Sequence, residues 1–317
     1  MRRVWGVVLA AVLAVAAGCG SDSGEAAAPA SVGLSPPGTP LVGGLVVPVG
    51  THLVGPVFPD LPHPLARYDR QVAVLQIDGD PFAAWDDLAG QAQDMGLPVA
   101  ASGVCTWLDS RYLATPVTGP APATTAALDC RGGGHRSLQD GPGVGIAMRM
   151  WWWDAGAELH VDYFEGDLGD LFSGGPTTGD PGPAPATAAD RLPKRDAPVA
   201  VEIGEPFGRE NNCFESGYDR LTLPAGARLV GGGTTPGSTG DFAAVLAVED
   251  PRAVLGALRD QLDGPDSSFG NYGLDEVALA DGTLVWSLTG GVEAGGGGCS
   301  MWSSPDGTAV LVTTSSD

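Results

Sequence analysis

Basic residues are scarce in this chain, and lysine is almost absent. The sequence has 16 lysines and arginines against 38 aspartates and glutamates, which gives a formal net charge of −22. Lys194 is the single lysine. Proteins that bind the phosphate backbone of nucleic acid need a basic patch, and an acidic protein is repelled by anionic lipid. The composition therefore excludes nucleic acid as a partner.

Known catalytic and metal-binding motifs are missing as well. The chain contains no Gly-x-Ser-x-Gly, Ser-x-x-Lys, His-Glu-x-x-His, P-loop or calcium-loop pattern. It has no Cys-x-x-Cys spacing, which argues against a zinc site. We therefore predict no catalytic residue, metal or cofactor, although catalytic groups can converge from distant positions of a chain. The four histidines are His52, His63, His135 and His160.

The N-terminus resembles the signal of a bacterial lipoprotein of the actinobacterial type. Two arginines precede an apolar run over 4–17, which is too short to span a bilayer comfortably, and small residues stand directly before Cys19. The resemblance implies that residues 1–18 are a signal peptide and that Cys19 is acylated. The acyl chains would hold the protein to the outer face of the cytoplasmic membrane. Residues 19–42 are rich in Gly, Ala, Ser and Pro and predict a disordered tether.

Four further cysteines are expected to form disulfides, because an exported protein meets an oxidising compartment. Four cysteines allow three pairings. We favour pairings that stay within one half of the chain, namely Cys105–Cys130 and Cys213–Cys299.

The sequence contains an internal repeat. Three segments of the first half match three of the second half in the same order, so we expect two copies of one module. Module 1 is expected over 43–165 and module 2 over 199–317, joined by a Pro/Gly-rich linker over 166–198. The matched pairs are 48–55 with 224–231, 72–81 with 243–251, and 150–161 with 301–312.

The order of strand and helix signals in each module predicts an α+β fold, a small antiparallel sheet with one helix on a face. An apolar β run is followed by Asp80-Pro81 in one copy and by Asp250-Pro251 in the other. Asp is a good N-cap and Pro suits the first helical position, so a helix is expected to begin at each step. Apolar side chains then recur at helical spacing. They are Phe82, Trp85, Leu88, Ala92 and Met95 in one helix and Val254, Leu255, Leu258 and Leu262 in the other.

Glycine positions give two further expectations. The triplets Asp154-Ala155-Gly156 and Pro305-Asp306-Gly307 predict three-residue hairpin loops, since Gly occupies the position that needs a left-handed residue. The glycine runs 132–134 and 295–298 predict flexible loops beside cysteines.

Three consecutive tryptophans raise the main functional question. Strand alternation predicts that Trp152 faces the helix together with Ile146, Met148 and Met150, and that Arg149, Trp151 and Trp153 face away. By the repeat, Trp302 joins the second group. Either these tryptophans fill the contact between two sheets, which we favour, or part of this face is open and binds a ligand.

The strand that follows has alternating polar residues, Glu158, His160 and Asp162. They match Ala309, Leu311 and Thr313 in the gapless alignment. A metal site is conceivable, but residues two apart on a strand lie nearly 7 Å from each other. We therefore expect a solvated polar face.

These observations favour a lipid-anchored protein of the cell envelope that is not an enzyme. It would bind a protein, peptide or glycan through a face formed by Arg149, Trp151, Trp153 and Trp302. Two alternatives stay open: an extracytoplasmic hydrolase with an unrecognised active site, and a purely structural accessory protein.

Overall fold

The structure is a computed structural model. It describes residues 32–61, 68–99, 104–109, 114–116, 125–138, 141–153, 156–168, 200–207, 220–232, 242–263, 272–292 and 296–315. All of these residues belong to one compact unit, Ser31–Asp317. The expected signal peptide, Cys19 and most of the expected linker lie outside the described residues.

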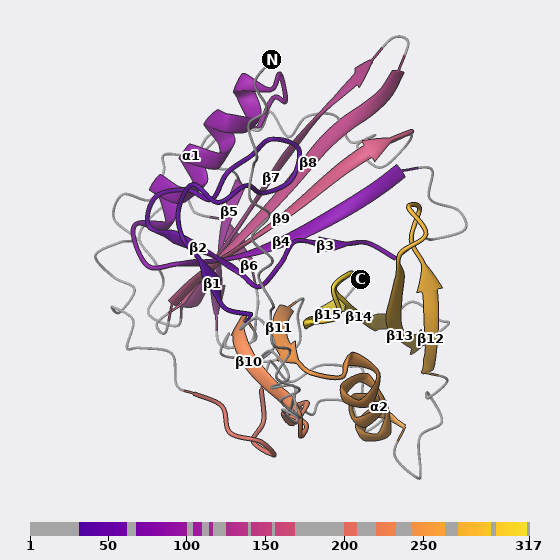
Figure 1. Ribbon diagram of the computed structural model, residues 1–317. Coiled ribbons are helices and arrows are strands. Elements are labelled where there is room, and N and C mark those ends of the chain that lie inside the picture. The colour runs from indigo at the N-terminus through magenta and orange to yellow at the C-terminus, as the bar shows by residue number, and fades with distance from the viewer. Residues whose placement is uncertain are drawn as a thin grey trace, which may run out of the picture. The chain divides into compact units, whose positions relative to one another are not determined.

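The first sheet is antiparallel throughout its described strands and has the order β1-β2-β4-β9-β8-β7-β5-β6, with β3 paired to β4. Its longest strands, β7 and β8, run side by side over most of their length (Figure 1). The strands are β1 Leu34–Ser35, β2 Thr51–Val54, β3 Phe58–Pro59, β4 Tyr68–Ile77, β5 Val104–Asp109, β6 Ala114–Pro116, β7 Thr125–Leu138, β8 Gly141–Trp153 and β9 Gly156–Gly166.

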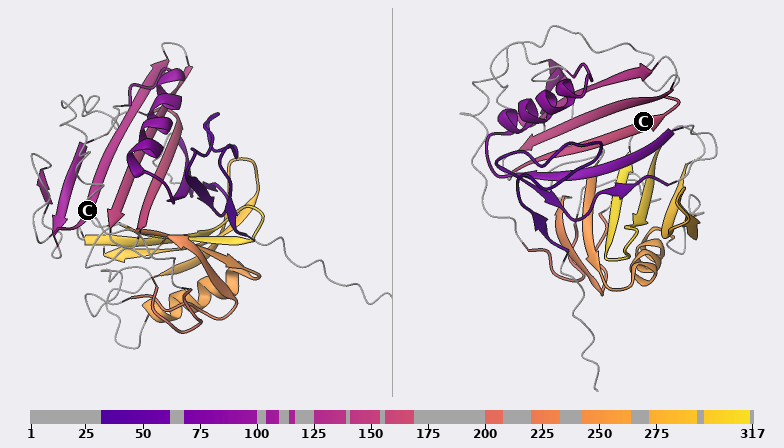
Figure 2. Two further views of the ribbon diagram at one scale, coloured as in Figure 1. Left: turned by 90° about the vertical axis from the view of Figure 1, so that its left-hand side faces the viewer. Right: turned by 45° about the horizontal axis from the view of Figure 1, so that its top comes forward.

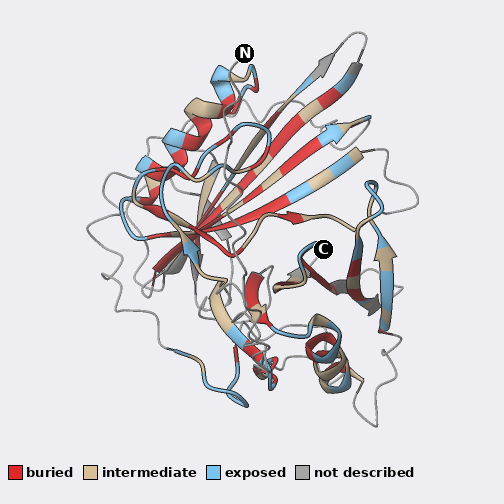
Figure 3. Cartoon of the chain, viewed as in Figure 1, coloured by how far each residue is buried: buried red, intermediate tan, exposed pale blue. Residues whose placement is uncertain are grey.

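Helix α1, Pro81–Asp94, covers one face of this sheet, as Figure 2 shows. It begins where the sequence predicts, because the Asp80 carboxylate caps it by accepting a hydrogen bond from the Phe82 N–H at 2.9 Å. Its apolar side is buried against the sheet in one core with Ile146, Met148 and Met150 of β8. Figure 3 shows this burial on the side of the helix that faces the strands. The predicted helix and its apolar face are confirmed.

The second sheet has the order β10-β11-β15-β14-β13-β12 and is also antiparallel. Helix α2, Pro251–Leu262, begins at Asp250, whose carboxylate accepts a hydrogen bond from the Ala253 N–H at 3.0 Å. The four apolar residues predicted for its inner face are all buried. The strands are β10 Ala227–Gly232, β11 Phe242–Val248, β12 Gly273–Ala278, β13 Leu284–Val292, β14 Gly296–Ser303 and β15 Ala309–Ser315.

The α+β class is confirmed, since two antiparallel sheets each pack against one helix. The sheets also share a strand order. In each, the strand before the helix (β4 or β11) lies between an earlier strand (β2 or β10) and the last strand of the sheet (β9 or β15). The strand that follows the helix, β5 or β12, lies towards the other end of its sheet. The connection that contains the helix therefore crosses from one side of the sheet to the other.

The two sheets contact each other through a third apolar core, on the faces that the helices do not cover. Glycine permits the close approach: a Cβ at Gly55 would lie 2.6 Å from Val245 Cγ1, and one at Gly231 would lie 2.8 Å from Val54 Cγ1. The indole N–H of Trp302 donates to the Pro59 carbonyl across this contact at 2.6 Å. The core consists of Val54, Phe58, Val72, Val74, Ala243, Val245, Trp302, Ala309 and Leu311.

Both predicted three-residue hairpin loops were wrong. Trp153 pairs with Gly156, so the first loop has only the two residues between them. In the second hairpin Ser303 pairs with Val310, and the longer turn contains Gly307 at φ +70°. Consequently Trp151 lies opposite Glu158, whereas Trp302 lies opposite Leu311. The gapless alignment matches Glu158 with Ala309, so in the second strand of the hairpin it differs from the observed pairing by two residues.

Two other expectations are corrected. The first glycine run lies inside β7 rather than in a flexible loop, and Gly296–Gly298 lie in β14. Glycine is needed there for packing, because a Cβ at Gly134 would lie 2.9 Å from the Pro98 carbonyl carbon. The expected tether ends early, since Leu34–Ser35 pair with β2 and Val42 is buried.

The predicted Cys105–Cys130 disulfide is confirmed. The two residues lie directly opposite each other on β5 and β7, with an S–S distance of 2.02 Å. Cys299 is also disulfide-bonded. Cys213 lies outside the described residues, so its pairing with Cys299 stays a prediction.

Loss of the first disulfide is expected to destabilise the fold. The bridge closes a loop with a sequence separation of 25, and the chain-entropy model gives about 3 kcal/mol for a loop of this size. We expect Cys105→Ser/Cys130→Ser to lower the free energy of unfolding by that amount in urea titrations. An unchanged midpoint would mean that β5 and β7 are held together without the bridge.

Tyr272 gives the protein a stability limit at high pH. Burial, together with the negative charge of Asp263, raises the pKa of Tyr272 to about 12 from 10.0. The unfolded chain therefore loses this proton first, so stability is full below pH 10 and falls as pH rises towards 12. We expect a loss on the order of 1 kcal/mol between about pH 9 and about pH 11 in urea titrations. Tyr272→Phe should reduce that loss, and an identical pH profile would contradict the assignment.

Candidate functional site

A charged array lies on the face of the first sheet that α1 does not cover. We use this name for six residues on three adjacent strands: Asp129 and Arg131 of β7, Arg149 and Trp151 of β8, and Glu158 and His160 of β9. Their neighbours along each strand, such as Leu128, Met150 and Leu159, are in the core beneath α1. Alternation therefore directs the six to the opposite face.

The array consists of two rows that cross the strands. Arg131, Arg149 and His160 are direct partners in one row, and Asp129, Trp151 and Glu158 are direct partners in the next. Like charges directly opposite each other destabilise a sheet. The stability of the sheet therefore does not favour a row of basic residues. Residues that act against stability in this way are concentrated at functional sites.

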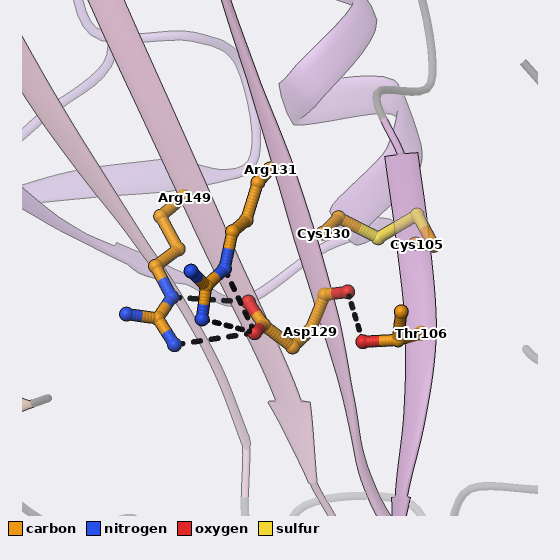
Figure 4. Close-up of a disulfide and its surroundings, with 6 residues drawn as sticks. All are labelled: Cys105, Thr106, Asp129, Cys130, Arg131 and Arg149. Atoms are coloured by element: carbon orange, nitrogen blue, oxygen red, sulfur yellow. Dashed lines mark hydrogen bonds and ion pairs between the residues drawn. A yellow bond between two sulfur atoms is a disulfide. The ribbon is translucent and has the colours of Figure 1, made fainter. Parts of the chain in front are cut away.

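Asp129 joins the two arginines (Figure 4). It is only 4 % exposed, and its carboxylate accepts from Arg149 Nε at 3.1 Å and Nη2 at 3.2 Å. The same carboxylate accepts from Arg131 Nε at 3.1 Å. Both guanidinium groups are thus held beside one buried carboxylate. The Arg131 side chain is 62 % exposed, so this end of the array reaches solvent.

Trp151 is in the middle of the array and is 2 % exposed. The Arg149 guanidinium lies over its ring, 4.3 Å from the centroid, and the His160 ring meets it edge-on with centroids 4.5 Å apart. Its indole N–H is buried and has no hydrogen-bond partner among the described residues. A buried polar group without a partner costs free energy and calls for an explanation.

Glu158 and His160 form a buried pair. Glu158 is 4 % exposed, and its Oε1 is hydrogen-bonded to His160 Nε2. The expectation of a solvated polar face is therefore wrong for Glu158, because the strand lies in the middle of a sheet whose uncovered face is itself packed. Asp162, the third alternating residue, binds Arg70 at 2.9 Å instead.

The residues of the expected binding face lie in different parts of the structure. Trp302 is 2 % exposed in the inter-sheet core, so it fills the contact between sheets, as we favoured. Trp151 and Arg149 belong to the charged array. The Trp153 side chain lies outside the described part of the chain. Trp152 packs into the core beneath α1 with its ring edge-on to Phe82, as predicted.

Asp129 and Arg131 were missed by sequence reasoning. The glycine run beside them predicted a loop, which hid the strand alternation that places both residues on the face of Arg149. The second sheet lacks a comparable array on the strand that corresponds to β9, because β15 carries Ala309, Leu311 and Thr313 there.

The remaining histidine and metal expectations can be compared with the described residues. His52 lies in β2, and its Nε2 lies 3.1 Å from Asp78 Oδ2. His63 lies outside the described part. Within that part, no group of three or more His, Cys, Asp or Glu side chains is arranged to hold a metal ion. Neither described helix is long and apolar enough to cross a membrane.

Comparisons with known proteins do not assign this chain to a family. No family model and no curated protein matches it. Among solved structures, a dehydratase domain from the CurK module of curacin polyketide synthase is 14% identical over 82% of this chain and 96% of that chain, with a TM-score of 0.14. An acyl-CoA thioesterase II from Mycobacterium marinum is 10% identical over 80% of this chain and 94% of that chain, with a TM-score of 0.12. Scores this low carry no argument about fold or activity.

Proposed function

We propose that this protein is anchored by acyl chains on Cys19 to the outer face of the cytoplasmic membrane, where it acts as a non-catalytic binding protein. The observation that carries the anchoring is the apolar run that ends in small residues directly before Cys19. The Cys105–Cys130 disulfide supports export, because such bonds persist in oxidising compartments. The charged array supports binding, since it concentrates buried polar groups at one place on the fold.

We also propose that the two sheets are copies of one module. Their common strand order and the Asp-Pro start of each helix support this proposal. Only the first copy carries the charged array. On this proposal the second copy serves mainly to pack against the first.

Anchoring is tested by replacing the acylated residue. In a bacterial host that processes lipoproteins, we expect the wild-type chain to incorporate an alkyne-labelled palmitate and to partition into the detergent phase. Cys19→Ser should lose both properties, whereas Ser21→Ala, a matched change beside it, should keep them. Label retained by Cys19→Ser would overturn the proposal.

A hydrolase is the second candidate, and the buried Glu158–His160 pair favours it. A carboxylate that orients a histidine is a common arrangement for general-base activation of water. Hydrolysis of p-nitrophenyl esters by the wild-type protein, with loss of about 10²-fold or more in His160→Gln, would support this function over the binding function. If the wild-type protein and His160→Gln both hydrolyse the ester only at the background rate, the hydrolase function is ruled out.

A further inference from the structure

We propose that the charged array binds a small oxyanion, a carboxylate or phosphate group, at the junction of Arg131, Arg149 and Trp151. The proposal rests on the binding function above and specifies its ligand class. It comes from two donors of the array, the Trp151 indole N–H and one terminal nitrogen of Arg131, which have no acceptor among the described residues.

The buried donor is the indole N–H of Trp151. It is closed off from solvent and has no acceptor among the described residues. Trp offers no other polar atom, and on this proposal a bound oxyanion supplies the acceptor. The Arg149 guanidinium lies over the same ring, 4.3 Å from its centroid.

The accessible donor is Arg131. Its Nε and Nη2 both contact Asp129, each at 3.1 Å, while its remaining terminal nitrogen has no partner among the described residues. Asp129 also contacts Arg149, so both guanidinium groups lie beside one carboxylate. An oxyanion approaching from solvent would meet Arg131 first. Oxygen acceptors with negative charge suit guanidinium donors well.

The arginines of the array share a carboxylate, since Arg131 and Arg149 both contact Asp129. Arg70 on the same sheet differs, because it has two carboxylates of its own, Asp60 and Asp162. Burial alone would lower the pKa of Arg70. The two carboxylates raise the pKa by more than burial lowers it, so the pKa of Arg70 lies above its ordinary value. Arg70 is therefore a saturated site and a matched control.

The test uses the full lipidated chain in detergent. We would titrate acetate and, separately, inorganic phosphate, with chloride at equal ionic strength as the reference, and follow tryptophan fluorescence and the melting temperature. We expect a saturable response to at least one oxyanion. Trp151→Phe and Arg131→Gln should each weaken the apparent affinity by about tenfold, while Arg70→Gln should leave it unchanged.

Each outcome decides the proposal. Preference for acetate identifies a carboxylate ligand and preference for phosphate identifies a phosphate ligand, and both support the site. A response no larger than that to chloride, or an unchanged response in Trp151→Phe, overturns it and leaves a trapped water as the partner of the indole. Should Trp151→Phe fold poorly, the ¹⁵N-indole resonance of Trp151 in the wild-type protein must shift with the oxyanion. Cys19→Ser should bind equally well, so failure of anchoring and failure of binding are distinguishable.

Discussion

Trp302→Ala is expected to lower the free energy of unfolding by about 3–5 kcal/mol, which is the usual range for removing a buried Trp. The ring is 2 % exposed and packs against residues of both sheets. The substitution also leaves the Pro59 carbonyl without its 2.6 Å donor. Guanidinium denaturation of wild-type and variant proteins measures the effect directly.

Two controls separate packing from hydrogen bonding. Trp302→Phe keeps most of the apolar ring and removes the N–H, so it should cost about 1–3 kcal/mol. Trp286→Ala removes a half-buried tryptophan on the neighbouring strand and should cost less than Trp302→Ala. If Trp302→Ala were as mild as Trp286→Ala, the two sheets would not depend on this contact.

Removing one partner of the Glu158–His160 pair is expected to be as damaging. Glu158→Leu leaves His160 without its carboxylate, and the loss of one member of a buried pair typically costs about 3–5 kcal/mol. The double variant Glu158→Leu/His160→Leu should recover much of that loss, because a pair of apolar residues leaves no buried polar group unpaired.

A double-mutant cycle of urea midpoints measures this coupling. The expected result is a double variant more stable than Glu158→Leu alone. Additive losses would show that the two side chains act independently.

Local signals predicted the parts of the fold that depend on neighbouring residues. Asp80-Pro81 and Asp250-Pro251 fixed both helix starts, because capping and proline chemistry act within one turn. Strand alternation placed Trp152 against α1. The Cys105–Cys130 pairing followed from proximity in sequence and is confirmed.

Long-range pairing was beyond the sequence signals. Gly132–Gly134 continue β7 because β8 and the segment after α1 pack closely on them, which a local pattern does not reveal. For the same reason Asp129 and Arg131 were not recognised as neighbours of Arg149. The buried state of Glu158 depends on how the sheets pack, whereas its alternation with His160 and Asp162 suggested solvent exposure.

We expect Cys19 to become the acylated first residue of the mature protein. The most direct test is mass spectrometry of the N-terminal peptide released from the membrane fraction. Lipid anchoring predicts a peptide that begins at Cys19 and carries a diacylglyceryl group. A peptide that begins elsewhere, or one with an unmodified Cys19, would contradict it.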